Sequence, residues 1–124
     1  MLARMATTIT PATRARRYAE RRYRGLDQRL VHALESRLVL RYVDELAGRG
    51  EEVLDMPCGY GRFTGPLLRR GLVVSAGDAD RARLDLLGEL VEGEVPVRCL
   101  RSEALPFDDA SFDATVCVRL LQHL

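Results

Sequence analysis

The sequence predicts one α/β domain built on a doubly wound parallel sheet. Two observations indicate this fold. Short apolar runs rich in valine alternate with helical patterns after residue 51, and these runs lack the polar–apolar alternation of strands with one face in water. The chain has 124 residues, which is enough for one modest domain.

The N-terminal part is expected to be helical. Residues 13–24 alternate charges around two tyrosines, which predicts a short, partly exposed helix. Residues 26–48 predict a long amphipathic helix that stops at Gly48, and we expect its apolar stripe to cover the sheet. The stripe consists of apolar residues spaced four apart, widened by two valines: Leu26, Leu30, Leu34, Leu38, Tyr42 and Leu46, with Val31 and Val43.

The remaining elements follow the rhythm strand, helix, strand, helix, strand, long loop, strand. The strands are expected within 52–56, 72–77, 95–100 and 112–118, and the helices within 62–70 and 80–92. The organisational boundary falls near residue 50, where the charge also changes sign. Residues 1–50 contain 11 arginines and 5 acidic residues, whereas residues 51–124 contain 8 arginines and 13 acidic residues.

The basic N-terminal part permits several interpretations. The first 19 residues could form an organelle-targeting peptide, but a frayed terminus in an arginine-only, bacterial-type composition is the preferred explanation. A nucleic-acid-binding module would use arginines interleaved with Tyr18 and Tyr23. Glu20, Asp27 and Glu35 argue against that module, and a solvated helical face fits better.

Composition excludes several kinds of chemistry. The chain contains no lysine, which excludes a Walker phosphate loop and Schiff-base catalysis. The three cysteines form no Cys-x-x-Cys pair, so neither a disulfide framework nor a metal site is expected, and a reducing cytoplasm fits this pattern. The apolar runs are far shorter than the ~18 residues that a membrane span needs, so no membrane association is expected.

A glycine turn follows the first predicted strand. Asp55 lies at the carboxyl end of that strand, and Gly59 and Gly61 form the turn into the next helix, where ligands bind in open parallel sheets. The dinucleotide fingerprint needs a third glycine where Thr64 stands, which argues against NAD. The carboxylate of Asp55 would repel a pyrophosphate and attract a cationic ligand.

The second predicted strand ends at Asp78, whose carboxylate can accept hydrogen bonds from both hydroxyls of a ribose. The alternative is an ordinary acidic residue at a strand end. Asp80 is better explained as the N-cap of the following helix.

Two strings now point to a family. VLDMPCGYGRF (53–63), with the acid at the end of the next strand and EALPFDDASFDATVCVRLLQHL (103–124), resembles class I S-adenosylmethionine-dependent methyltransferases of the small-molecule type. The resemblance implies a Rossmann-like fold, S-adenosylmethionine as cofactor and a small-molecule methyl acceptor. It implies that residues 1–50 form a helical cap and that 51–124 form the N-terminal part of the cofactor-binding domain.

The resemblance also implies a set of cofactor-binding residues. The amino-acid part of the cofactor would lie against Asp55, Cys58, Gly59 and Gly61, and the ribose against Asp78. Ser102 and Glu103 would flank the adenine, and Val118 and Arg119 would reach the mouth of the site. Pro57 and Ala79 complete the cofactor-binding set.

Three residues depart from the family pattern. Pro57 replaces the first glycine of the loop and removes one amide donor, and Gly77 replaces the apolar residue before the ribose acid. Arg101 stands where an acid commonly contacts the adenine amino group. An inert cofactor-binding fragment is therefore the alternative to an active enzyme.

The family's sheet has seven strands, and the chain stops after the fourth. In the family these four strands lie side by side in the order three, two, one, four. The fourth strand would then be an exposed edge, which predicts self-association or a truncated record. The catalytic residues stay unassigned. Tyr18 and Tyr23 could line the acceptor pocket but fit packing better, His32 and Cys58 are interpreted as packed side chains, and for His123 an acceptor-facing role and a capping role are equally favoured.

Overall fold

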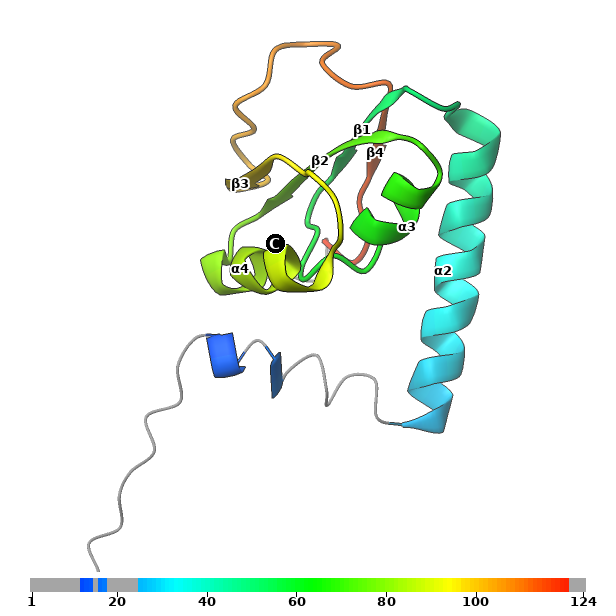
Figure 1. Ribbon diagram of the computed structural model, residues 1–124, viewed down its shortest axis with the longest axis vertical. Coiled ribbons are helices and arrows are strands. Elements are labelled where there is room, and N and C mark those ends of the chain that lie inside the picture. Colours follow the sequence, from blue (N-terminus) through cyan, green and yellow to red (C-terminus); the bar gives the residue numbers. More distant parts are fainter. Residues whose placement is uncertain (1–11, 15, 18–24, 121–124) are drawn as a thin grey trace, which may run out of the picture.

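The computed structural model describes residues 12–14, 16–17 and 25–120 (Figure 1). The residues of the predicted helix 13–24 that it describes are helical and exposed. Tyr18, Tyr23 and His123 lie outside the described residues, so the expectations for them stay predictions.

A four-stranded parallel sheet forms the centre of the molecule. Its strands are β1 (Glu52–Asp55), β2 (Val73–Asp78), β3 (Val97–Cys99) and β4 (Ala114–Val116). They lie in the order β3-β2-β1-β4, and every pairing is parallel. This confirms the predicted strands and their order. Because the strands are parallel, β1 and β2 bring their carboxyl ends to one edge of the sheet.

The helices that precede or connect these strands within residues 25–120 are α2 (Leu26–Leu46), α3 (Thr64–Arg69) and α4 (Arg81–Leu90). Asp80 is the N-cap of α4, as predicted, because its side chain accepts a hydrogen bond from the amide of Ala82 at 2.9 Å. All three helices pack on the same face of the sheet. The core residues on this face come from strands and helices alike: Val53, Val74, Ala76 and Val116 from the strands, and Val43, Leu67, Leu84 and Leu87 from the helices.

The prediction for the apolar face of α2 is wrong. The residues spaced four apart are exposed, from 55% for Leu34 and Leu38 to 84% for Leu26. Residues four apart advance by about 40° around a helix of 3.6 residues per turn, so the stripe winds by about 200° between Leu26 and Leu46. Of the predicted stripe, Val43 is the member that packs on the core, and its neighbours there are Val39, Leu40 and Ala47, which were not predicted.

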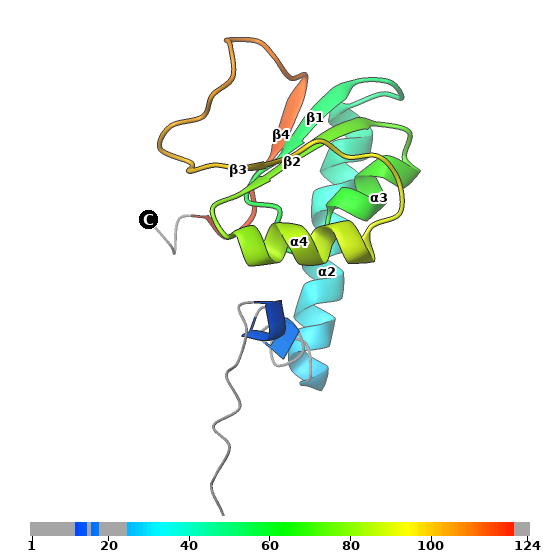
Figure 2. The same ribbon diagram turned by 60° about the vertical axis from the view of Figure 1, so that its left-hand side comes forward.

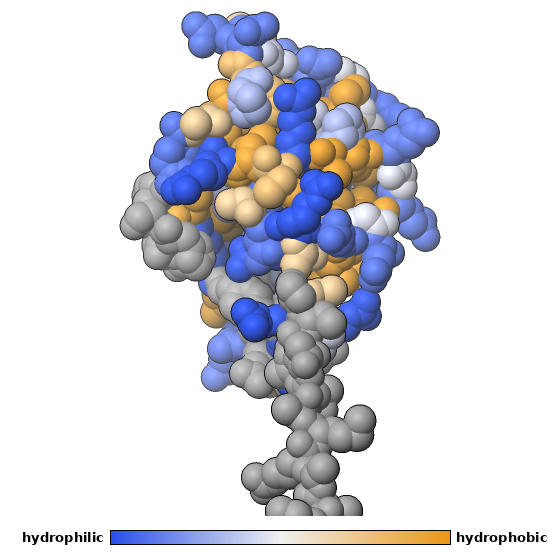
Figure 3. Space-filling view, turned by 90° about the vertical axis from the view of Figure 1, so that its left-hand side faces the viewer, coloured by the Kyte–Doolittle hydropathy of each residue, from blue (hydrophilic) through white to orange (hydrophobic). Residues whose placement is uncertain are grey.

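The other face of the sheet is covered by the irregular segment 100–113. Leu54 and Leu100 are buried there, and Phe107 and Phe112 pack against them with their rings edge to face, 4.9 Å apart. The cover is incomplete, since Val73 is half exposed on this side. Figure 2 shows this segment on the side of the sheet away from α2 and α4. In Figure 3, which faces the β3 edge, hydrophobic residues are visible across the middle of the surface, interrupted by hydrophilic side chains.

Candidate functional site

The loop after β1 folds back across the end of β2. It begins with a cis peptide bond between Met56 and Pro57. The amide of Cys58 donates to the carbonyl of Gly77 at 2.8 Å, and the amide of Gly59 donates to a carboxylate oxygen of Asp78 at 2.9 Å. Two hydrogen bonds therefore hold the loop on the strand that carries the predicted ribose acid.

Both glycines of the loop adopt positive φ, 58° at Gly59 and 97° at Gly61, which other residues rarely adopt. A Cβ at Gly61 would also lie 2.5 Å from Cγ2 of Val91, at the end of α4. Gly77 serves packing too, since a Cβ there would lie 3.0 Å from the sulfur of Met56. Gly77 is thus more than a departure from the family pattern, because its missing side chain leaves room for Met56.

Asp78 is buried, with 3% of its surface exposed, and both of its oxygens accept backbone amides. One accepts from Gly59 and the other from Asp80, each at 2.9 Å. An ionised carboxylate has about four lone-pair positions, so two acceptor positions are left for other donors. Asp78 thus fixes the loop and keeps the capacity to bind a pair of hydroxyls.

Asp55 lies beneath the loop and is 1% exposed. The hydroxyl of Thr64, the first residue of α3, donates to it at 2.7 Å. Burial raises the pKa of Asp55 to about 7, the Thr64 hydrogen bond acts against this shift, and the nearby charge of Asp78 adds to it. Thr64 was noted in the sequence only as a missing glycine, and its contact with Asp55 was not expected.

A cavity of about 340 Å³ opens beside Asp78. Five of the predicted cofactor-binding residues line it: Pro57, Asp78, Ala79, Ser102 and Glu103. Arg101, noted as a departure from the family pattern, lines it as well. Three lining residues were not predicted from the sequence: Met56, Arg83 and Leu120. The sequence signal for Arg83 is its position in the first turn of the helix that follows Asp78, three residues after the N-cap Asp80. In the structure it forms an ion pair with Asp80 at 3.6 Å.

The other predicted residues do not line this cavity. Asp55 and Cys58 are buried, Gly59 donates to Asp78 from the loop, and Gly61 borders a second cavity between α3 and the end of α4. Val118 packs against the core shared by α2 and the sheet. Burial raises the pKa of the Cys58 thiol, so it stays protonated, which agrees with its interpretation as a packed thiol.

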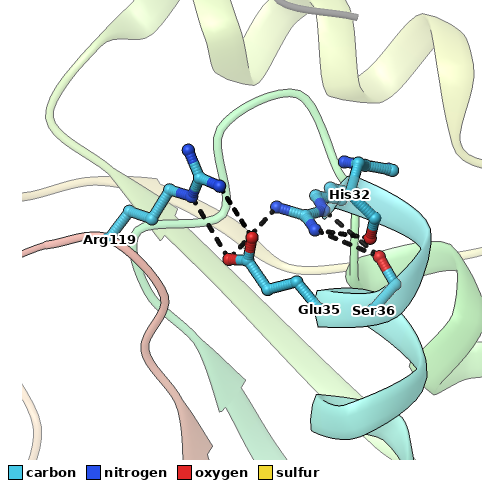
Figure 4. A network of polar contacts seen from close by, with 5 residues as sticks. His32, Glu35, Ser36 and Arg119 are labelled. Carbon is cyan, nitrogen blue, oxygen red and sulfur yellow. Dashed lines mark hydrogen bonds and ion pairs between the residues drawn. The ribbon is translucent and has the colours of Figure 1, made fainter. Parts of the chain in front are cut away.

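Charged side chains connect α2 with the turn after the glycine loop and with the segment after β4 (Figure 4). The carboxylate of Glu35 accepts two hydrogen bonds from Arg119, at 3.2 and 2.7 Å, and lies 3.6 Å from a guanidinium nitrogen of Arg62. Arg62 also donates to the hydroxyl of Ser36 and the carbonyl of His32. The structure thus places His32 beside the glycine loop.

Comparison with known families gives the site its context. The model of a methyltransferase domain matches residues 53–124, which include the glycine loop, Asp78 and every residue that lines the cavity beside it. The chain belongs to this methyltransferase family. The assignment confirms the predicted family.

Curated relatives of this methyltransferase domain include ubiquinone biosynthesis O-methyltransferases. The one from Alkalilimnicola ehrlichii is 36% identical over 93 residues, which cover 70% of this chain and 38% of that protein. The one from Coxiella burnetii is 28% identical over 89 residues, 68% of this chain and 38% of that protein. The chain therefore spans less than half the length of the curated relatives it matches.

Solved structures share the fold of this methyltransferase domain. The magnesium protoporphyrin IX methyltransferase from Synechocystis, solved with S-adenosylmethionine bound, has a TM-score of 0.67 at 20% identity, covering 95% of this chain and 66% of that one. The geranyl diphosphate C-methyltransferase from Streptomyces coelicolor has a TM-score of 0.54 at 26% identity, covering 68% of this chain and 35% of that one. Within the described residues, no helix is long and apolar enough to cross a membrane.

Proposed function

We propose that the whole protein transfers a methyl group from S-adenosylmethionine to a small-molecule acceptor, and that the cavity beside Asp78 holds the nucleoside of the cofactor. The observation that carries the proposal is that Asp78 both anchors the glycine loop and lines this cavity together with Ser102 and Glu103. A volume of about 340 Å³ is within the range of small-molecule sites.

The residues present fit the cofactor. Asp78 has acceptor positions left for the two ribose hydroxyls, and Ser102 and Glu103 border the space expected for the base. Asp55 lies behind the loop, where a cationic amino group would be attracted to its carboxylate and would favour the ionised form of Asp55. Arg101 lines the same cavity and offers donors where relatives of this family commonly offer an acceptor.

When bound, the cofactor supplies a methyl group activated on a sulfonium. The chain's own task is to bind and orient it and to exclude water, because an in-line displacement depends mainly on positioning and desolvation. Pro57, Gly59 and Gly61 fix the shape of the loop for this task. Val118 and Arg119 follow β4 and directly precede Leu120, which lines the cavity. The proposal assigns no general acid or base.

The acceptor is proposed to be a small molecule on the strength of the relatives. Their names describe ubiquinone biosynthesis O-methyltransferases, and one structural neighbour was solved with geranyl diphosphate. The division into a cap (1–50) and a cofactor-binding part (51–124), a bacterial origin, a cytoplasmic location and self-association through the β4 edge stay predictions. Whether the chain is a fragment, and whether it is inert, are also open predictions.

Isothermal titration of the full chain with S-adenosylhomocysteine tests the site. Asp78→Ala should weaken binding about 10- to 150-fold, corresponding to the ~1.5–3 kcal/mol of a charged hydrogen bond. Asp80→Ala is the matched control, because it removes a helix cap two residues away and should lower stability by ~1 kcal/mol without a comparable loss of affinity.

Two results would contradict the proposal. Equal affinity of the wild-type chain and Asp78→Ala would place the ribose elsewhere. Binding of NADH without binding of S-adenosylhomocysteine would mean that the cofactor is a nicotinamide dinucleotide and not S-adenosylmethionine. Asp78→Asn removes the negative charge but can keep the loop anchored, since its carbonyl oxygen can still accept a hydrogen bond from the amide of Gly59.

A further inference from the structure

Three segments that are distant in sequence meet at the carboxylate of Glu35. Arg62 belongs to the turn that follows the glycine loop, Arg119 follows β4, and Glu35 lies on α2, 84 residues before Arg119. Arg119 binds the carboxylate with two nitrogens, an arrangement that fixes direction as well as distance. Figure 4 shows the guanidinium group of Arg119 directed at the carboxylate of Glu35 on α2.

Both arginines belong to segments that border the proposed cofactor site. Arg62 directly follows the glycine loop, whose Pro57 lines the cavity beside Asp78, and itself lines the second cavity with Gly61. Arg119 directly precedes Leu120, which lines the cavity beside Asp78. Arg119 has a φ of 60°, a left-handed conformation that costs energy in a residue other than glycine. Arg119 therefore combines a strained backbone with the ion pair to Glu35.

The environment of these charges makes their pairing stronger than that of a typical surface ion pair. The side chain of Arg62 is 11% exposed, that of Glu35 is 24% exposed and that of Arg119 is 38% exposed. The hydrogen bonds from Arg119 lower the pKa of Glu35 most, and the charge of Arg62 lowers it further. Glu35 therefore stays ionised at neutral pH between two cations.

We propose that Glu35 is a positioning residue for the cofactor site: by binding Arg62 and Arg119 together, it sets the distance between the glycine loop and the segment after β4. This inference rests on the proposed function, because it assumes that the cofactor lies between these two segments. Glu35 acts through the two arginines and need not touch the cofactor.

A purely structural explanation is that Glu35 only attaches α2 to the domain. The structure offers a matched test of it. Asp44, on the same helix, forms an ion pair of 2.7 Å with Arg70, near the amino ends of the strands and away from the site. The second half of α2 is also attached by Val43, which is buried in the core, whereas its first half extends past the ends of the strands (Figures 1 and 2).

The decisive experiment is titration of the full chain with S-adenosylhomocysteine. Glu35→Gln should weaken binding about tenfold, and Asp44→Asn should change it less than twofold although it also removes an arginine pair made of two hydrogen bonds, on a more exposed part of the helix. Glu35→Gln and Arg119→Gln should be strongly non-additive, because either change breaks the same pair. Glu35→Asp, which keeps the charge on a shorter side chain, should restore part of the affinity.

Hydrogen exchange of the ligand-free chain provides an independent readout. Glu35→Gln should speed exchange in the glycine loop and in residues 117–120, whereas Asp44→Asn should leave both unchanged. Unchanged exchange there, or affinity within twofold of wild type, overturns the inference, as do additive effects of Glu35 and Arg119.

The two proposals fail in different ways. If Asp78→Ala weakens binding and Glu35→Gln does not, only the positioning role is wrong. If Asp78→Ala has no effect, the proposed cofactor site is wrong.

Discussion

Replacing Asp55 by asparagine should make this domain more stable above neutral pH. The pKa of Asp55 is raised from 3.8 to about 7 by burial. Below pH 3.8 the folded and unfolded states both hold the proton, so the residue has no net effect there. Between that pH and about 7 the unfolded chain is ionised while the folded chain keeps the proton. The free energy of unfolding therefore falls by about 1.4 kcal/mol for each pH unit.

The full loss of unfolding free energy caused by Asp55 is reached near pH 7 and stays constant above that pH. A shift of about three pKa units corresponds to about 4 kcal/mol. Asparagine has nearly the same shape, carries no charge and keeps an oxygen that can accept the hydroxyl of Thr64. At pH 8 the variant should thus exceed the wild type by up to about 4 kcal/mol, and near pH 4 the two should be similar.

Urea unfolding of both proteins at pH 4, 5, 6, 7 and 8 measures this effect. The difference between their unfolding free energies isolates Asp55, because the other titrating groups are common to both. It should grow steadily up to about pH 7 and then level off. A difference that is constant from pH 4 to 8 would refute the reasoning, since the pKa of Asp55 would then be the same in the folded and unfolded states.

Three further changes test the packing around the site. Thr64→Val removes the donor to Asp55 and should cost about 1.5–3 kcal/mol in urea unfolding at pH 8, with a smaller cost at pH 5, where Asp55 is protonated. Gly61→Ala should lower the thermal midpoint, with a cost of about 1–3 kcal/mol, because it combines a φ of 97° with a Cβ contact of 2.5 Å; an unchanged midpoint by circular dichroism would contradict this. In thermal unfolding, Val43→Ala should destabilise the domain by about 2 kcal/mol because Val43 is buried in the core. Leu34→Ala should cost less than about 0.5 kcal/mol because Leu34 is exposed. The reverse order of the two effects would mean that the leucines spaced four apart face the core.

Features encoded by neighbouring residues could be predicted from the sequence. The valine-rich runs located all four strands, and Asp80 was recognised as an N-cap because a cap is a local hydrogen bond between a side chain and an amide two residues later. The placement of Asp78 at the cavity followed from its position at the end of a parallel strand.

Features that depend on distant contacts could not be predicted. Nothing near Glu35 in the sequence indicates Arg119, because the two meet only after the sheet has formed. The contact between Thr64 and Asp55 depends on how the loop turns into α3. The error in the orientation of α2 has a different cause. A helix repeats every 3.6 residues, so residues spaced four apart wind around it and do not stay on one face.

The winding of the leucines on α2 limits how this helix can be covered. A flat surface that contacts a helix spans roughly 100° of its circumference, and successive leucines differ by about 40°, so such a surface can meet only about three of them at once. Burying the series from Leu26 to Leu46 would require a neighbouring element that wraps around the helix α2, or separate neighbours at its two ends.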